Sequence, residues 1–353
     1  MTASAIVAID SSAPYRPSVL VRLFAAIERL PFGGWWVYPA LYLALATYLQ
    51  AALWLTGASP VGTLSLDASA GVAFGPFLLA ATHYLVRTAA RAMDIFRPAS
   101  GLSDAEFAAR RYELVTLRAG ELWLPAAIGG VVGIGSILTA SSEGLAPYGS
   151  KVTSALVVIG PAVVLGYGAT VVLLYQSIRQ LRYVARLLDD ASAISLFDTS
   201  PLFAFSRLTA SVGVVIVFVA YYAFATSAAY QLGNVLAIGV IAANMILGVV
   251  VFVVPLLGVH GRLVDEKAAL VRGVNQRFEA LRTELYGRVD ASNVSGAKEV
   301  VDTLGGLEQI RQRIDKLPTW PWPPALLRGF VSAILLPIVV FLLTRVASGL
   351  LGN

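Results

Sequence analysis

The sequence predicts an all-α, polytopic integral membrane protein with seven transmembrane helices and a cytoplasmic antiparallel helical hairpin between spans six and seven. Three observations lead to this prediction. The 353 residues are 57% hydrophobic and only 13% charged, whereas soluble domains carry about 25% charged residues. Seven apolar runs approach the ~20 residues that a helix needs to cross the hydrocarbon core. Lys and Arg gather in alternate connections, which sets the direction of each crossing.

The seven apolar runs cover residues 36–57, 70–87, 122–141, 152–177, 204–227, 233–258 and 326–350. The bilayer core offers no water to backbone N–H and C=O groups, so each run is expected to be helical. The second run is the weakest, because it is short and contains Pro76 and His83. Counting it as a span keeps every Arg-rich connection on one side of the membrane, and this consistency favours seven crossings.

The basic residues predict the orientation. Of the 26 Lys and Arg residues, all except Lys151 and Arg345 lie in segments that seven crossings place on the same side. The positive-inside rule makes that side the cytoplasm. We therefore expect a multi-pass protein of the cell (inner) membrane with a cytoplasmic N-terminus and an external C-terminus. The Arg-rich, Cys-free composition is the basis for expecting a prokaryotic inner membrane.

The chain divides into four parts. Residues 1–34 form a cytoplasmic segment with an interfacial amphipathic helix, residues 35–258 a six-span bundle with cytoplasmic helical connections, residues 259–325 a coiled-coil-like hairpin, and residues 326–353 the seventh span. The amphipathic helix begins after Ser18, a favourable N-cap residue. Its expected apolar face consists of Leu20, Leu23, Phe24, Ile27 and Leu30.

The hairpin is predicted from helical periodicity on both sides of a turn. Apolar residues recur from Val264 to Leu285 at the three–four spacing of a coiled-coil seam. Residues 290–296 are rich in turn formers, and a second periodic segment runs from Val300 to Leu317. Such seams also favour self-association, so a homo-oligomer is expected. Residues 262–317 are the expected binding region for a cytoplasmic protein partner.

Three residues of the last two spans are candidates for a polar path. Asn244 lies near the middle of span six among small residues, where its amide either bonds to a neighbouring helix or lines a route for an ion or solute. Arg345 lies well inside span seven, where it either snorkels to the external headgroups or faces the pore. Pro337 removes a backbone hydrogen bond in the same span, which makes it a candidate gate kink.

His83, near the cytoplasmic end of span two, is either a packing residue or a pH-sensitive one. The sequence contains no Cys and only two His residues, far apart, and it shows no carboxylate cluster or phosphate-binding loop. We therefore expect no catalytic site, no metal and no cofactor. Nucleic acid is not expected as a partner, because membrane orientation accounts for the positive charge.

Two functions remain open from the sequence. The first is a channel, receptor or carrier with a path near spans six and seven. With its cytoplasmic N-terminus and a long cytoplasmic helical insertion before span seven, the threading resembles that of insect odorant and gustatory receptor channels. Residues Phe341–Arg345 do not match the aromatic-and-glutamine signature of the last span of those channels. The alternative is a membrane-anchored scaffold or sensor whose hairpin binds a partner and which transports nothing.

Overall fold

The computed structural model describes residues 14–139, 148, 151–190, 200–226, 235–292 and 294–351. These residues are helical apart from short connections, and the only β-type pairing among them is an isolated bridge between Pro17 and Arg118. The predicted all-α class is therefore confirmed. Asn244 and the His83 region lie within the described residues, whereas the side chains of Pro337 and Arg345 lie outside them.

The helices follow one another along the chain without a sheet. The first half contains α1 (Val19–Glu28), η1 (Pro31–Gly34), α2 (Val37–Leu55), α3 (Leu66–Val72), α4 (Phe74–Ser100), α5 (Asp104–Val115), η2 (Ala119–Glu121) and α6 (Trp123–Leu138). The second half contains α8 (Val152–Val158), α9 (Gly160–Asp190), α10 (Ser200–Thr226), α11 (Val235–Val253), η5 (Val254–Leu256), α12 (Leu257–Asp290), α13 (Val294–Asp315) and α14 (Pro324–Leu351).

Six segments of the described chain are long and apolar enough to cross a membrane, and they indicate a membrane protein. They are Val37–Leu55, Ala68–Ser100, Ala119–Leu138, Gly160–Leu188, Phe203–Tyr222 and Ala242–Asp290. Each overlaps one of the first six predicted spans. The seventh predicted span falls within α14, of which Pro324–Leu336 is a shorter apolar helix. Seven crossings thus stay a prediction.

Two predicted spans are interrupted at proline. Span four is split into α8 and α9, with the break at Ile159 directly before Gly160 and Pro161. Span six ends in the short 3₁₀ helix η5, which contains Pro255, and the chain then continues as α12. Proline has no N–H and its ring clashes with the preceding turn, so a regular helix cannot pass through these positions unchanged.

The bundle packs closely where glycines allow two helices to approach. A Cβ atom added at Gly129 of α6 would overlap the backbone of Tyr167 and Gly168 in α9. On the other side of the bundle, a Cβ at Gly213 of α10 would lie 2.8 Å from the carbonyl oxygen of Gly248 in α11. Small residues at both contacts are typical of membrane helix interfaces. Gly129, which with Gly133 forms a GxxxG pattern in the sequence, therefore marks a close contact between α6 and α9.

The N-terminal segment is fixed to the chain that follows α5. The Ser18 N–H donates to the carbonyl of Leu117 at 2.8 Å, and the Ala119 N–H donates to that of Arg16 at 3.1 Å. The Tyr15 hydroxyl donates to the carbonyl of Thr116 at 2.9 Å, and burial raises the pKa of this phenol. These bonds set where α1 begins, and Ser18 caps it as predicted by accepting from the N–H of Val21.

The face that α1 buries differs in part from the predicted one. Of the expected apolar face, Phe24 and Ile27 pack in the main protein core together with Val21, and Ala25 is also buried, whereas Leu23 and Leu30 are exposed. Apolar residues cover most of this helix, so periodicity alone does not select a single face. The contact with α4 selects it, and Leu23 and Leu30 remain on the outer side.

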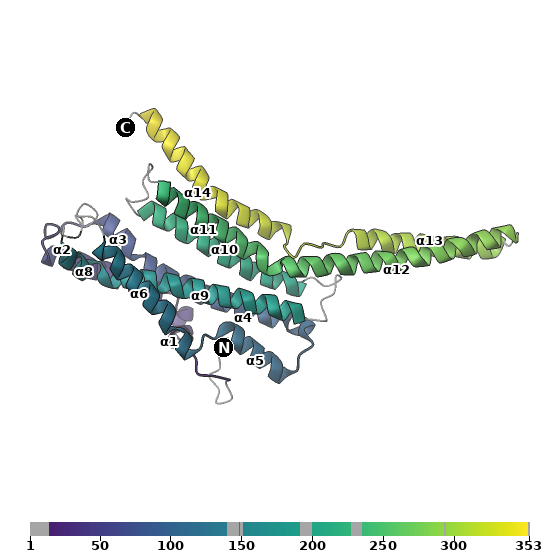
Figure 1. Ribbon diagram of the computed structural model, residues 1–353, viewed down its shortest axis with the longest axis horizontal. Helices are drawn as coiled ribbons and strands as arrows, with labels where there is room; N and C mark the ends of the chain where they lie inside the picture. The colour runs from purple at the N-terminus through teal and green to yellow at the C-terminus, as the bar shows by residue number, and fades with distance from the viewer. Residues whose placement is uncertain are drawn as a thin grey trace.

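The longest feature of the molecule is the pair α12 and α13, which extends away from the bundle (Figure 1). The two helices lie side by side. The Lys267 ammonium, near the base, donates to the carbonyl of Asp315 at 2.7 Å. Farther out, Arg311 donates to the Asn275 side chain at 3.3 Å. α14 then returns along the bundle towards the end opposite the pair (Figure 1).

Candidate functional site

Four polar side chains meet in the core between α1, α2 and α4. They are Glu28, Tyr38, His83 and Arg87, referred to below as the His83 cluster. His83 is fully buried, and the carboxylate of Glu28 is 5% exposed. Buried ionisable groups are costly unless they are paired and hydrogen-bonded. Their pairing makes this cluster the main candidate site of the described chain.

The turn between α1 and α2 positions one wall of the cluster. Phe32, Gly33 and Gly34 all have positive φ, near 58°, 68° and 69°. A Cβ atom at Gly34 would overlap the carbonyl oxygen of Ile27, so only glycine fits there. This tight reversal lays Trp35 against His83.

His83 is held between two aromatic rings. Its imidazole stacks on Phe24, with a centroid distance of 4.7 Å and an interplanar angle of 5°, and on Trp35 at 4.9 Å and 18°. The Tyr38 hydroxyl lies 2.6 Å from Nδ1. When this hydroxyl donates to Nδ1, the remaining ring proton is on Nε2 and points towards Glu28. The rings therefore fix the plane of the imidazole, and Tyr38 selects its tautomer.

The carboxylate of Glu28 lies close to both Arg87 and His83. Its Oε1 atom lies 3.2 Å from Nε of Arg87 and 3.5 Å from Nε2 of His83. Glu28 is also the last residue of α1, where the helix dipole disfavours a negative charge. Arg87 offsets this, and its guanidinium lies 5.7 Å from the Trp35 ring centroid in a cation–π contact.

The imidazole of His83 has a phenol at Nδ1 and a carboxylate near Nε2. Protonation would turn Nδ1 into a donor, so Tyr38 would have to accept rather than donate. It would also place a second positive charge against Glu28. Because these groups belong to α1, α2 and α4, the cluster connects all three helices. The sequence identified His83 as a candidate but missed Glu28, whose signal was an acid at the end of an apolar helix.

Asn244 lies on α11, which contributes nothing to the His83 cluster. It is half-buried and makes a polar interaction, and one turn later Gly248 packs against Gly213. Pro337 and Arg345 lie in α14, where the backbone is helical from Pro324 to Leu351. Their side chains are outside the described residues, so the kink and the pore-facing charge stay predictions.

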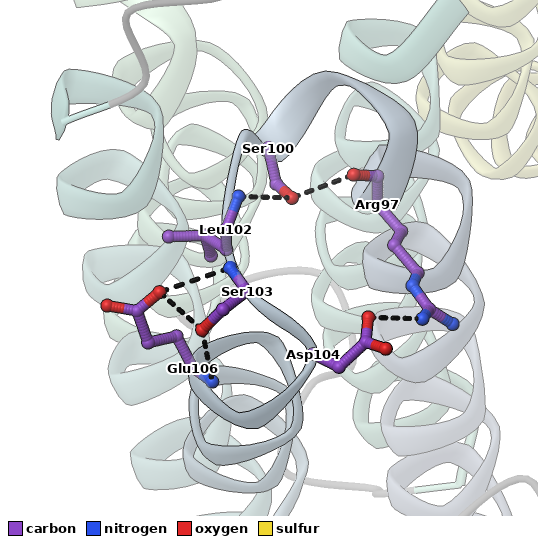
Figure 2. Close-up of polar contacts among 6 residues, drawn as sticks. All are labelled: Arg97, Ser100, Leu102, Ser103, Asp104 and Glu106. Carbon is purple, nitrogen blue, oxygen red and sulfur yellow. Dashed lines mark hydrogen bonds and ion pairs between the residues drawn. The ribbon is translucent and has the colours of Figure 1, made fainter.

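A cavity of about 390 Å³ lies between α5 and α9, near the turn that follows α4. Its wall contains Arg110 and Arg186 as well as Glu106 and Glu113, so its charges balance. Hydrogen bonds from Ser103 lower the pKa of Glu106, and the two residues form the capping box of α5 (Figure 2). On the other side of this turn, Arg97 pairs with Asp104 at 2.7 Å (Figure 2).

A buried polar stripe on α9 was also missed by the sequence analysis. Gln176, Ser177 and Gln180 are all buried, and next to them Arg179 donates to the carbonyl of Glu113 at 2.8 Å. Gln176 and Ser177 precede Gln180 by four and three residues, and this spacing in the sequence indicates that the three side chains share one helical face. Of these side chains, Arg179 and Gln180 join α9 to the end of α5 through the carbonyls of Glu113 and Leu114. Among the described residues, no group of three or more His, Asp or Glu side chains could hold a metal ion.

Comparison of the chain with protein-family models, with curated proteins and with solved structures gives no match. The function must therefore be argued from the molecule itself.

Proposed function

We propose that the chain is a membrane-anchored scaffold or sensor whose α12–α13 hairpin binds a cytoplasmic protein partner. The supporting observation is the incomplete burial of the hairpin. Val274, Val300 and Ile314 are buried along its seam. Other apolar side chains are about half exposed or more, including Tyr286 at 61%, Val301 at 51% and Ile310 at 48%. The hairpin extends beyond the bundle (Figure 1), and the predicted topology puts it outside the bilayer, where lipid would not cover these side chains.

We also propose the membrane topology that the sequence predicts, with seven crossings. Seven crossings put residues 262–317 in the cytoplasm together with the Arg-rich connections. α14 has 28 residues, and at 1.5 Å per residue a helix of about 20 already spans the hydrocarbon. The C-terminus is then external. Fusions of a cytoplasmic and a periplasmic reporter to the two chain ends test this, and ends in the same compartment would refute it.

The partner surface can be tested without removing the hairpin. A photo-crosslinking amino acid at Ile310 of the full-length chain should trap one protein in native membranes. Val301→Glu together with Ile310→Glu should abolish that adduct when the crosslinker is placed at Tyr286, whereas Gln309→Glu, an exposed neighbour, should not. Deletion of 262–317 should remove the partner while the spans still insert. An adduct that survives the double substitution would refute this surface.

Self-association is the second outcome that the seam favours. A chain–chain adduct, together with a dimeric mass in detergent, would identify the occupant of the hairpin as another copy. The proposal assigns no catalytic activity, since the sequence offers no constellation of residues for it.

Transport is a second candidate, supported by the polar Asn244 in the otherwise apolar α11. A side-chain amide at this depth either forms a hydrogen bond to a neighbouring helix or lines a polar path. Chloride flux into liposomes that contain the purified protein distinguishes these roles. If Asn244 and Arg345 line a path, the chloride flux should be lower in the Asn244→Leu or Arg345→Ala variant than in the unaltered protein. Flux equal to that of empty liposomes, or unchanged in both inserted variants, would reject the path.

A further inference from the structure

A second cavity, of about 280 Å³, lies between α4, α10 and α14. Its wall is mostly apolar and includes Tyr84 of α4, Ala210 and Val214 of α10, and Ala325 and Gly329 of α14. The wall on α14 consists partly of small residues, which leave space that larger side chains would fill. A Cβ atom at Gly329 would have nothing within 4 Å.

Phe330 forms the closed side of this cavity. It is 4% exposed, stacks on Phe252 of α11 at 4.1 Å, and its ring lies 2.7 Å from where a Cβ of Gly213 would be. Phe330 therefore connects α14 to α10 and α11 on the inner side. On the outer side, Tyr84, Ala325 and Gly329 are exposed. The cavity is thus a groove that opens away from the core.

Membrane orientation puts the groove in the inner leaflet. α10 begins at Ser200 and α14 at Pro324, and the proposed threading makes both starts cytoplasmic. Ala210 and Ala325 lie in the first half of each helix. An apolar groove at this depth faces acyl chains.

Helical spacing puts two arginines near the end of the groove that the proposed topology makes cytoplasmic. Arg207 precedes Ala210 and Ser211 by one turn on the same face of α10, and Arg91 follows Tyr84 by two turns on the same face of α4. Both residues are exposed, and within the described residues neither forms an ion pair with a carboxylate.

Negative charge is scarce around this mouth. The sequences of α10 and α14 contain no Asp or Glu. The only acidic residue of α4 is Asp94, whose carboxylate accepts from Arg111 of α5 at 2.7 Å. The cavity between α5 and α9 differs, because its wall contains as many acidic as basic side chains. An apolar groove with positive charge at its cytoplasmic end matches the acyl chain and the phosphate of an anionic phospholipid.

We propose that this groove binds an anionic phospholipid of the inner leaflet, with an acyl chain along Ala210, Val214 and Gly329 and the phosphate at Arg91 and Arg207. The site rests on the proposed membrane orientation and not on the proposed scaffold role. Basic residues near an anionic headgroup contribute about fivefold each to affinity. Phosphatidylglycerol should therefore bind about 25-fold more tightly than phosphatidylcholine.

Native mass spectrometry of the purified full-length chain, titrated with phosphatidylglycerol or phosphatidylcholine in detergent, tests the site. The Arg91→Gln, Arg207→Gln double variant should lose most of the preference for phosphatidylglycerol, while Arg29→Gln, another exposed arginine next to a span, should keep it. Gly329→Leu should lower retention of both lipids, because its side chain fills the groove. Gly135→Leu of α6, whose Cβ also has open space, is the matched control.

Equal retention of the two lipids by the unaltered chain would mean unspecific annular lipid and would overturn the proposal. A double arginine variant that keeps the preference, or a Gly135→Leu variant that loses as much lipid as Gly329→Leu, would also overturn it. If Gly329→Leu does not give a monodisperse protein, the arginine variants decide the question. Reporter fusions measure orientation independently, so failure of the threading is distinguishable from failure of the lipid site.

Discussion

Replacing Arg87 by Met should destabilise the protein far more than replacing Arg97 by Met. Both arginines are on α4 and both pair with a carboxylate. Arg87 is 22% exposed and its partner Glu28 only 5%, whereas Arg97 and Asp104 are 57% and 89% exposed. The two substitutions therefore remove the same side chain from a buried pair and from a solvated pair.

The structure sets the expected magnitude. Breaking a buried pair by removing one partner costs about 3–5 kcal/mol, because the other charge is left without compensation. His83 remains 3.5 Å from Glu28 and lowers this cost, so we expect about 2–3 kcal/mol for Arg87→Met on the same scale. The solvated Arg97 pair should contribute about 0–1 kcal/mol.

The measurement is reversible unfolding in mixed detergent micelles, followed by tryptophan fluorescence. The double variant Glu28→Gln, Arg87→Met should recover part of the stability lost by Arg87→Met, because it also removes the stranded charge. The reasoning would be refuted if the free energies of unfolding of Arg87→Met and Arg97→Met differed by less than about 0.5 kcal/mol. A difference that small would mean that breaking the buried pair costs no more than breaking the solvated one. It would equally fail if the double variant were less stable than Arg87→Met.

Three further outcomes are expected. Gly34→Ala should be about 1–3 kcal/mol less stable than Gly33→Ala in the same unfolding assay, because both have positive φ but only the Cβ at Gly34 overlaps Ile27; equal stabilities would argue against the tight reversal. Gly129→Ala should lower the unfolding midpoint, whereas Gly130→Ala, with its nearest neighbour at 3.8 Å, should not; similar losses would place the α6–α9 contact elsewhere. The folded-state pKa of Glu106 is lowered, so the stabilisation it gives α5 is present above the unfolded pKa of about 4.3 and is lost as the pH falls through the folded value. Hydrogen exchange of the first turn of α5, corrected for its intrinsic pH dependence, should report this loss, and Glu106→Gln should remove the pH dependence.

Local patterns were sufficient for the parts of the fold that depend on near neighbours in the sequence. Two examples are the Ser103–Glu106 capping box, whose Ser-x-x-Glu spacing is visible in the sequence, and the Glu284–Arg288 pair at 2.5 Å. Each joins residues three or four positions apart, a distance at which helical geometry alone brings side chains together. The first six apolar runs likewise coincide with apolar helices, because length and composition determine this property residue by residue.

The His83 cluster could not be assembled from the sequence, because its members are far apart along the chain. Tyr38 and His83 are 45 positions apart, and the turn at Gly34 decides whether Trp35 and Tyr38 face α4 at all. The signal for that turn was weak, since Phe32 adopts a positive φ that its residue type does not announce. The residues of α1 that pack in the core could not be selected from the sequence for a related reason, because a largely apolar helix is oriented by its neighbours.

The way in which the α12–α13 hairpin joins the bundle bears on the proposed scaffold role. Leu256 of η5 and Val259 and Leu263 of α12 are buried in the same core that contains Phe24 and Met93. Arg262 donates to the carbonyl of Leu188, at the end of α9, at 2.9 Å. The base of the hairpin is therefore packed into the bundle, and a shift of α9 or α11 would have to move the hairpin with it. A scaffold on a loose linker would not have this property, so the structure favours a hairpin whose direction depends on the packing of the membrane helices.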